Sequence, residues 1–115
     1  MPEKEPPAII CQGDRDTPAF AELMPVTIVL DRLRSAFNVG NIFRLADATR
    51  AEEIITCGYT ATPPHLKLAK TARDCDKLVA CRHIATVTDA IRELQAQGRT
   101  VYAVETVADA DLIWD

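Results

Sequence analysis

Short apolar runs alternate with helical patterns along this chain, and this alternation constrains the fold more than any other feature. Three of the runs are VTIVL (26–30), EIITC (53–57) and TVYAVE (100–105), and KLVACRHI (77–84) is a candidate fourth. Continuous apolar runs of this length, rich in β-branched residues, are typical of strands that are covered on both faces. The sequence therefore predicts an α/β fold in which crossover helices join three or four parallel strands.

Two helices are expected between these strands. In TVTDAIRELQAQG, Thr86 precedes Asp89 by three residues, as in a capping box, and Gly98 follows the apolar residues at helical spacing. Another helix is predicted to begin near Asn38, because four apolar residues there share one helical face: Val39, Ile42, Phe43 and Ala46. This helix would join VTIVL to EIITC as adjacent parallel strands by a right-handed crossover.

The length of 115 residues allows one domain at most. Five of the seven prolines lie within the first 25 residues, which show no sustained hydrophobic period. We therefore predict a proline-rich leader over residues 1–25, extended along the domain or mobile, and one domain over residues 26–115.

Composition restricts the classes of function. A net charge of -4 and a pI near 5.1 give no overall attraction to nucleic acid, so RNA binding would need a local cationic patch. No apolar run approaches the roughly 20 residues of a membrane span, and the N-terminal residues MPEKEPPAII lack a secretory signal pattern. We expect a cytoplasmic protein with no membrane partner.

The four cysteines contain no C-x-x-C pair. Without an export signal, free and mostly buried thiols are the expected state of Cys11, Cys57, Cys75 and Cys81. A metal held by Cys75, Cys81 and His83 is the alternative, but the gaps between these residues do not match zinc spacings. We predict no metal site.

A polar cluster follows the first predicted strand, in and just before RSAFNVGNIFRLADATR (34–50). It holds three arginines and two asparagines within thirteen residues: Arg32, Arg34, Asn38, Asn41 and Arg44. In open parallel sheets, ligands bind at the carboxyl ends of the strands. Arginine and asparagine side chains suit phosphate and sugar hydroxyl groups. The cluster therefore predicts a surface for ligands of that kind.

Structural explanations for the same residues stay open. Asn38 is a candidate N-cap, and Gly40 would permit close approach to the neighbouring strand. Arg44 and Asp47 have the spacing of an ordinary surface ion pair.

A second group of cations follows the sequence TPPH. Lys67, Lys70 and Arg73 have helical or near-helical spacing. They form either a solvated helix face or a contact to an RNA backbone.

The segment VLDRLRSAFNVGNIFRLADATRAEEIITCGYTATPPHLKLAKTA (29–72) resembles the first half of the catalytic domain of the SpoU (TrmH) RNA methyltransferases, members of the SPOUT superfamily. Asn38, Gly40 and Arg44 match the first signature of that family. GYTATPP (58–64) and KTA (70–72) resemble later features, in the same order. The likeness runs from about Val26 to Glu105.

This resemblance implies methylation of a ribose 2′-hydroxyl in tRNA or rRNA, with S-adenosylmethionine as cofactor, by a homodimer whose α/β domain ends in a trefoil knot. Carried onto this sequence, Arg44 would be the catalytic residue and Asn38 would position the ribose. Because a guanidinium stays protonated, we expect Arg44 to hold the attacking oxygen and stabilise its negative charge rather than act as a base. The expected RNA contacts are Arg32, Arg34, Asn41, Lys67, Lys70 and Arg73.

Two further signatures of the family, Asn-Glu-x-x-Gly and Ser-Leu-Asn-Val-Ser, do not occur in the sequence, whose one serine is Ser35. In the family they build the knot and hold the cofactor. We therefore expect the N-terminal part of a SPOUT (α/β knot) domain that lacks its knot-forming part and its cofactor site and is inactive alone. The alternative is a non-catalytic remnant that binds RNA or another protein.

Overall fold

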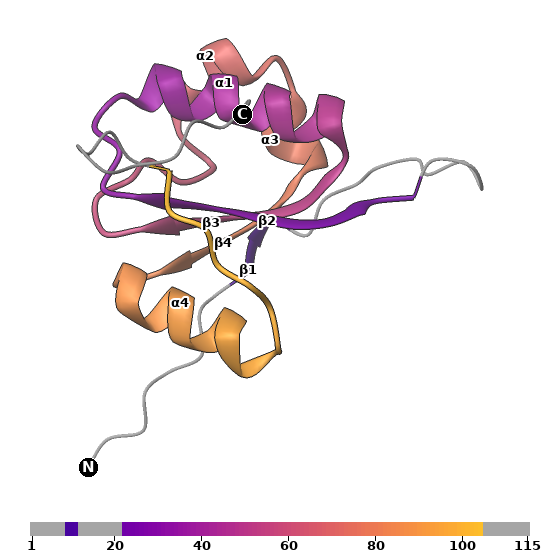
Figure 1. Ribbon diagram of the computed structural model, residues 1–115. Coiled ribbons are helices and arrows are strands. Elements are labelled where there is room, and N and C mark those ends of the chain that lie inside the picture. Colours follow the sequence, from indigo (N-terminus) through magenta and orange to yellow (C-terminus); the bar gives the residue numbers. More distant parts are fainter. Residues whose placement is uncertain (1–8, 12–21, 105–115) are drawn as a thin grey trace.

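The computed structural model describes residues 9–11 and 22–104, which form a four-stranded sheet with helices on both faces (Figure 1). The strand order is β1-β4-β3-β2. The strands are β1 (Ile9–Cys11), β2 (Met24–Asp31), β3 (Ala51–Cys57) and β4 (Ala80–Ile84). The helices are α1 (Ala36–Thr49), α2 (Leu66–Ala72), α3 (Cys75–Leu78) and α4 (Val87–Ala96).

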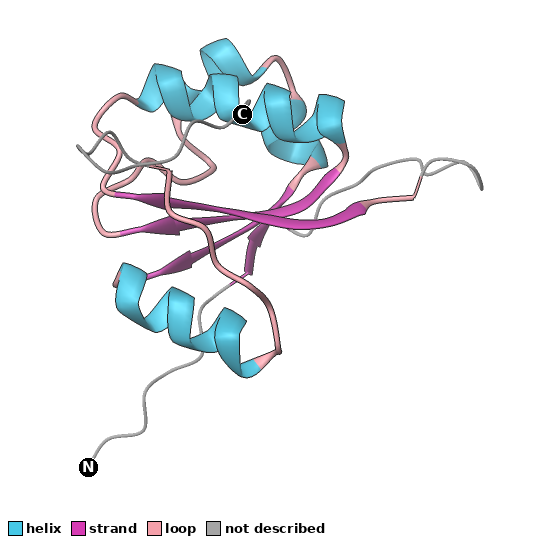
Figure 2. Ribbon diagram, in the orientation of Figure 1, coloured by secondary structure: helices cyan, strands magenta, loops and turns pink. Residues whose placement is uncertain are grey.

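Strands β2, β3 and β4 are parallel neighbours, as their apolar runs predict. Ile28 of β2 pairs with Ile54 of β3, which in turn pairs with Cys81 of β4. Helices α1, α2 and α3 cover one face of the sheet and α4 covers the other (Figure 2). Because both faces of the sheet are covered, polar and apolar residues do not have to alternate along these strands. The run 77–84 is a strand only from Ala80, since its first residues belong to α3.

Two apolar clusters fill the space on either side of the sheet. The first lies under α1 and α2 and includes Phe43, Ile54 and Leu68, which are fully buried. The second lies between the sheet and α4 and includes Ile55 and Leu94. Because side chains alternate along a strand, the neighbours Ile54 and Ile55 point to opposite faces. Strand β3 therefore anchors both clusters.

Part of the predicted leader is a strand. β1 pairs with β4 in antiparallel orientation, with Ile9 opposite Arg82 and Cys11 opposite Cys81. At the other edge of the sheet, β2 begins at Met24, two residues before the predicted start of the domain. The predicted boundary between residues 25 and 26 thus falls within a strand.

Helix α1 begins at Ala36, before the predicted start near Asn38. Ser35 is its N-cap, since its Oγ accepts the backbone N–H of Asn38 at 3.1 Å. The alternative in which Asn38 caps the helix is therefore wrong, because Asn38 lies in the first turn. The close approach predicted at Gly40 is made, but to helix α2 rather than to a strand.

Helix α4 has the predicted signals at both ends. Thr86 accepts the N–H of Asp89 at 3.2 Å and donates its hydroxyl to the Asp89 carboxylate at 2.9 Å. Gly98 follows the helix with a φ of 79°, the left-handed conformation that glycine adopts freely. These signals predict the helix correctly because they act between residues close in sequence.

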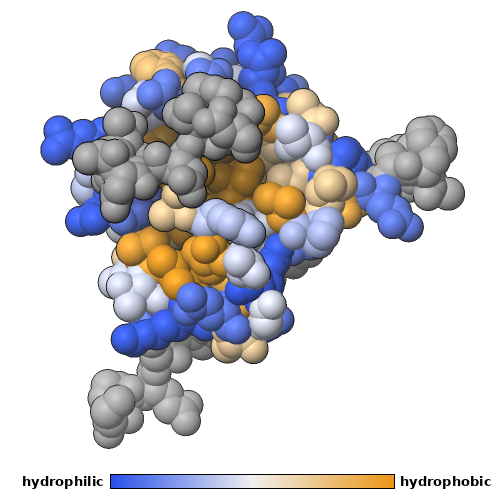
Figure 3. All heavy atoms as spheres, viewed as in Figure 1, coloured by the Kyte–Doolittle hydropathy of each residue, from blue (hydrophilic) through white to orange (hydrophobic). Residues whose placement is uncertain are grey.

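The strand predicted at TVYAVE (100–105) is wrong in its described part. Residues 100–104 are neither strand nor helix, and Glu105 lies outside the described residues. Val101 packs against the α4 cluster, whereas Tyr102 and Val104 are largely exposed. The outer edge of β2 pairs with no strand of the described residues. In the view of Figure 1, apolar residues gather on the surface between the layer of α1 and helix α4 (Figure 3).

Arg99 fixes the segment that follows α4 to the sheet. Its guanidinium donates to Thr27 Oγ1 at 2.8 Å, to Glu52 Oε1 at 2.6 Å and to the carbonyl oxygen of Pro25 at 2.9 Å. The chain is therefore held at the N-terminal end of β2 after it leaves α4. Among the described residues, no helix is long and apolar enough to cross a membrane.

Candidate functional site

The polar face of α1 points away from the sheet. Asn38, Asn41 and Arg44 recur every three residues, and all three are exposed. Val39 and Phe43, on the opposite side of the helix, are fully buried. The predicted division of this helix into an apolar and a polar face is confirmed.

Arg44 lies about 9 Å further along the axis of α1 than Asn38, because each of the six steps from residue 38 to residue 44 rises about 1.5 Å. Asn38 is therefore at the carboxyl end of β2, whereas the backbone of Arg44 lies over the sheet. Arg44 is one of the charges that act on the Cys75 thiol, so its guanidinium lies on the side of α1 that faces α3. The two predicted catalytic residues share a helix face but not a helix turn.

Arg32 is a paired cation at the carboxyl end of β2. Its backbone is left-handed, with a φ of 51°. Its guanidinium donates two hydrogen bonds to the Asp31 carboxylate, at 3.1 and 3.2 Å. Hydrogen bonding and attraction to Asp31 raise the pKa of Arg32. The Arg32 side chain is still 65% exposed, and Arg34 is also exposed, so both remain accessible to a ligand.

A tight turn after β3 completes this edge. The N–H of Thr60 donates to the carbonyl oxygen of Cys57 at 3.2 Å, and Gly58 in the turn has a φ of 61°. The buried Thr60 hydroxyl lies 2.7 Å from the Cys57 carbonyl oxygen and 3.2 Å from that of Leu30, and it accepts the N–H of Leu33 at 3.0 Å. The turn is therefore bound to β2 as well as to β3. Sequence patterns alone did not single out this threonine.

Thr56 and His83 form a hydrogen-bonded chain on the neighbouring strands. The fully buried Thr56 hydroxyl lies 3.1 Å from His83 Nδ1 and 2.7 Å from the hydroxyl of Thr62. His83, Cys75 and Cys81 were the alternative candidates for a metal site. The residues that the structure describes contain no group of three His, Cys, Asp or Glu side chains arranged to hold a metal.

The described cysteines are free thiols, as predicted. Cys57 and Cys81 are buried, and Cys75 is partly buried with its thiol 3.8 Å from the Asp47 carboxylate. Burial, together with the Asp31 carboxylate, raises the pKa of the Cys57 thiol to about 11. The side chain of Cys11 lies outside the described residues.

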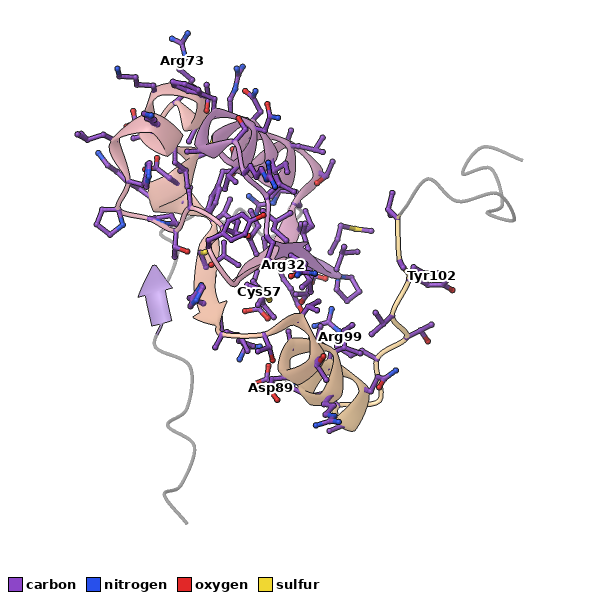
Figure 4. All side chains as sticks on the ribbon, turned by 90° about the vertical axis from the view of Figure 1, so that its left-hand side faces the viewer. Arg32, Cys57, Arg73, Asp89, Arg99 and Tyr102 are labelled. Carbon is purple, nitrogen blue, oxygen red and sulfur yellow. The ribbon has the colours of Figure 1, made fainter. Side chains whose placement is uncertain are left out.

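The second group of cations lies on and after α2. Lys67 and Lys70 are exposed on this helix, and Arg73 follows its last residue with a φ of 51°. Figure 4 shows Arg73 well apart from Arg32, with its side chain directed away from the body of the protein. Helix α2 packs on the first turns of α1, where Thr71 donates its hydroxyl to a backbone carbonyl at 2.6 Å. The two lysines thus share one helical layer with the polar face of α1.

The sequence of the chain was compared with models of known protein families. Residues 25–113 match the model of the SpoU rRNA Methylase family. The chain belongs to the SpoU rRNA methylase family. This confirms the resemblance inferred from residues 29–72. The matched range of this SpoU domain contains all of the predicted site residues, from Arg32 to Arg73.

The SpoU domain is also similar to a solved structure, the crystal structure of an AdoMet-bound rRNA methyltransferase from Sinorhizobium meliloti. The identity is 31% and the TM-score is 0.58. The match covers 65% of this chain but 28% of that one, so this chain spans little more than a quarter of that protein. The likeness confirms the predicted fold class, an α/β domain with a parallel sheet. No curated protein sequence gave a match.

Proposed function

We propose that this domain is the RNA-handling part of an RNA methyltransferase that modifies ribose 2′-hydroxyls of tRNA or rRNA. Its membership of the SpoU family carries the proposal, and its likeness to an rRNA methyltransferase supports it. The exposed cations of α1 and α2 provide local positive charge on a chain whose net charge is -4. Such local charge is what contact with RNA phosphates requires.

Arg44 is the proposed catalytic residue. Its exposure makes the guanidinium accessible to a ribose. The N–H groups would hold the 2′-oxygen and stabilise the negative charge that develops on it. Because a guanidinium remains protonated, the hydroxyl proton would pass to water or to a phosphate. Asn38 would orient the ribose through the paired donor and acceptor of its amide.

The proposed RNA contacts fall into two groups by position. Arg32 and Arg34 lie at the carboxyl end of β2, beside the nucleotide that Asn38 would hold. Asn41, Lys67 and Lys70 lie on the helical layer and would contact the adjoining backbone. Arg73 is also proposed as a contact, and its separation from Arg32 requires an RNA that extends across this layer.

The proposed methyl donor is AdoMet, which is bound in the similar rRNA methyltransferase from Sinorhizobium meliloti. The buried hydroxyls at the carboxyl edge of the sheet do not fit it. The buried hydroxyls of Thr56 and Thr60 at the carboxyl edge are already bonded to His83, Thr62 and backbone groups. A site for adenosine needs available donors and acceptors beside apolar walls. We therefore propose that residues other than the described ones hold the cofactor.

A homodimer is proposed for the enzyme. Phe37 and Leu45 are 43% and 57% exposed although they lie on the helix that carries the SpoU signature. Large apolar side chains gathered on one exposed face favour contact with another chain. A second copy would have to cover Phe37 and Leu45 without covering Arg44, which the proposed chemistry requires to be open to RNA.

A non-catalytic RNA-binding or protein-interaction module is the second candidate. The bonding of the Thr56 and Thr60 hydroxyls to other groups of the protein, which leaves them unsuited to AdoMet, favours it. One experiment separates the two: transfer of tritium from labelled AdoMet to tRNA and rRNA, with RNA binding measured in parallel. Methyl transfer that disappears when the target ribose is replaced by 2′-deoxyribose supports the enzyme. RNA binding without methyl transfer supports the module, and the absence of both contradicts each proposal.

A further inference from the structure

Tyr59 is an exposed aromatic residue held on a rigid turn. Its side chain is 61% exposed. The turn that carries it is fixed by the Thr60 N–H bond to Cys57 and by a bond from the N–H of Gly58 to the carbonyl oxygen of Ala85, at 3.1 Å. The turn is therefore attached to the residue that follows β4 as well as to β2 and β3. Because its backbone is already held, Tyr59 has less conformational freedom to lose when it binds a partner.

Arg32 lies against the same turn. The register of the parallel strands pairs Asp31 with Cys57, so the residues that follow them, Arg32 and Gly58, are neighbours across the sheet edge. A β-carbon at Gly58 would stand 2.8 Å from Cγ of Arg32, which shows that the aliphatic part of Arg32 lies over the glycine. The two hydrogen bonds to Asp31 then fix the plane of the guanidinium.

We propose that Tyr59 and Arg32 form a platform on which an unpaired RNA base stacks. Aromatic rings and guanidinium planes are the two kinds of surface on which proteins stack RNA bases, and here one of each is exposed on adjacent turns. The base must be unpaired, because both faces of a base within a helix are covered by its neighbours. This inference rests on the proposed function, since it takes RNA as the ligand.

The left-handed backbone of Arg32 agrees with this role. A non-glycine residue at a φ of 51° is uncommon and tends to persist where surrounding contacts fix it, often at binding sites. At Arg32 the contact is the pair of hydrogen bonds from its guanidinium to the Asp31 carboxylate. The same pairing fixes the plane of the guanidinium, so its face is available to a ligand together with the N–H groups that Asp31 does not use.

The second tyrosine of the chain provides a matched control. Tyr102 is 85% exposed but lies in the segment after α4, far from the turn that carries Tyr59 (Figure 4). Binding of a short fluorescein-labelled single-stranded RNA is measured by fluorescence anisotropy. Stacking on an aromatic residue typically contributes about tenfold in affinity, so Tyr59→Ala should weaken binding by about that factor. Tyr59→Phe and Tyr102→Ala should stay within about twofold of the native protein.

Arg32→Lys tests the other half of the platform. Lysine keeps the charge but has no planar group, so affinity should fall about threefold. Circular dichroism melting of each variant confirms that the fold is retained, which the exposure of both side chains leads us to expect. Unchanged RNA binding by both Tyr59→Ala and Arg32→Lys would overturn the platform.

An abasic nucleotide in the RNA identifies the base as the ligand. Scanning one abasic position along the RNA should find a position that costs the native protein about tenfold and costs Tyr59→Ala almost nothing, because the stacking partner is already gone. Equal losses in the two proteins at every position would show that Tyr59 contacts something other than a base. Displacement of the RNA by free adenosine at comparable concentrations would assign the platform to a nucleoside ligand instead.

The outcomes distinguish this inference from the function on which it rests. If the native protein binds no RNA, the proposed function fails and the platform fails with it. If the native protein binds RNA and Tyr59→Ala binds equally well, the platform alone is wrong.

Discussion

Gly40 of α1 and Thr71 of α2 stand so close that no side chain fits at residue 40. A β-carbon there would lie 2.0 Å from Thr71 Oγ1, 2.3 Å from the carbonyl oxygen of Leu68 and 2.9 Å from the backbone nitrogen of Ala72. Two of these three atoms belong to the backbone, so rotation of a side chain does not relieve the contact. Helix packing therefore explains the glycine of the SpoU signature without any ligand.

Gly40→Ala should destabilise the protein. At an ordinary helical position this change stabilises by about 1 kcal/mol, whereas forcing extra atoms into a packed site costs about 1–3 kcal/mol. We expect the free energy of urea unfolding to fall by about 1–2 kcal/mol. Asn41→Ala, on the exposed face of the same helix, should leave it unchanged or slightly higher. Native stability in Gly40→Ala would show that the two helices are not packed this closely.

Arg44→Ala should abolish most methyl transfer without unfolding the protein. Removing a donor that stabilises developing negative charge lowers the rate by about 10²–10³-fold. The melting temperature should not change, because Arg44 is exposed. Methyl transfer is measured in the enzyme form that carries activity, with Arg73→Ala as a control that weakens RNA binding at most. Activity that falls only in proportion to the folded fraction would assign Arg44 a structural role.

Cys57 should make stability depend on pH in the alkaline range. Its pKa is about 11 in the folded protein against 9.0 when unperturbed, so between these values the unfolded thiol loses its proton and the folded thiol keeps it. The folded state then binds more protons, and stability falls as pH rises, by up to about 2–3 kcal/mol. Below pH 9 this contribution is constant. Cys57→Ala should show a correspondingly smaller decline in urea unfolding between pH 8.5 and pH 11, and an equal decline would contradict the shift.

Arg82 should be required for stability. It bridges three elements, because its guanidinium from β4 bonds to Glu53 of β3 at 3.1 Å and to Glu93 of α4. The Arg82 side chain is only 19% exposed. Arg82→Met would leave two carboxylates close together without a cation, and we expect a loss of about 2 kcal/mol in urea unfolding. Arg92→Met, at an exposed position on α4, is the control, and an equal effect of the two changes would refute the bridging role.

Sequence patterns correctly predicted those elements whose signals all lie within their own residues. β2 and β3 are apolar β-branched runs, and α4 carries both its caps within its own sequence. β1 was missed because three residues form a strand only when β4 is already beside them. TVYAVE has the composition of a strand, but residues 100–104 pair with no other strand, and composition alone does not provide a partner.

In the candidate site too, features set by local spacing could be predicted from the sequence, whereas features set by the pairing of distant strands could not. The polar face of α1 follows from helical spacing, so its exposure was predictable from Asn38 to Arg44. The contact between Arg32 and the turn at Gly58 depends on the register between β2 and β3, which the sequence does not specify. The clue that was available is the order of the residues: a glycine and a tyrosine directly after a buried strand place an aromatic side chain on a turn.

Strand β1 has a consequence for the order of events during synthesis. It is made before the other strands, yet its partner β4 follows about 70 residues later, which takes seconds at the usual rates of translation. During that interval β2, α1 and β3 can already pack together, since their contacts are close in sequence. Strand β1 is thus made before the other three strands but cannot pair until β4 is complete, so it is among the last to join the sheet.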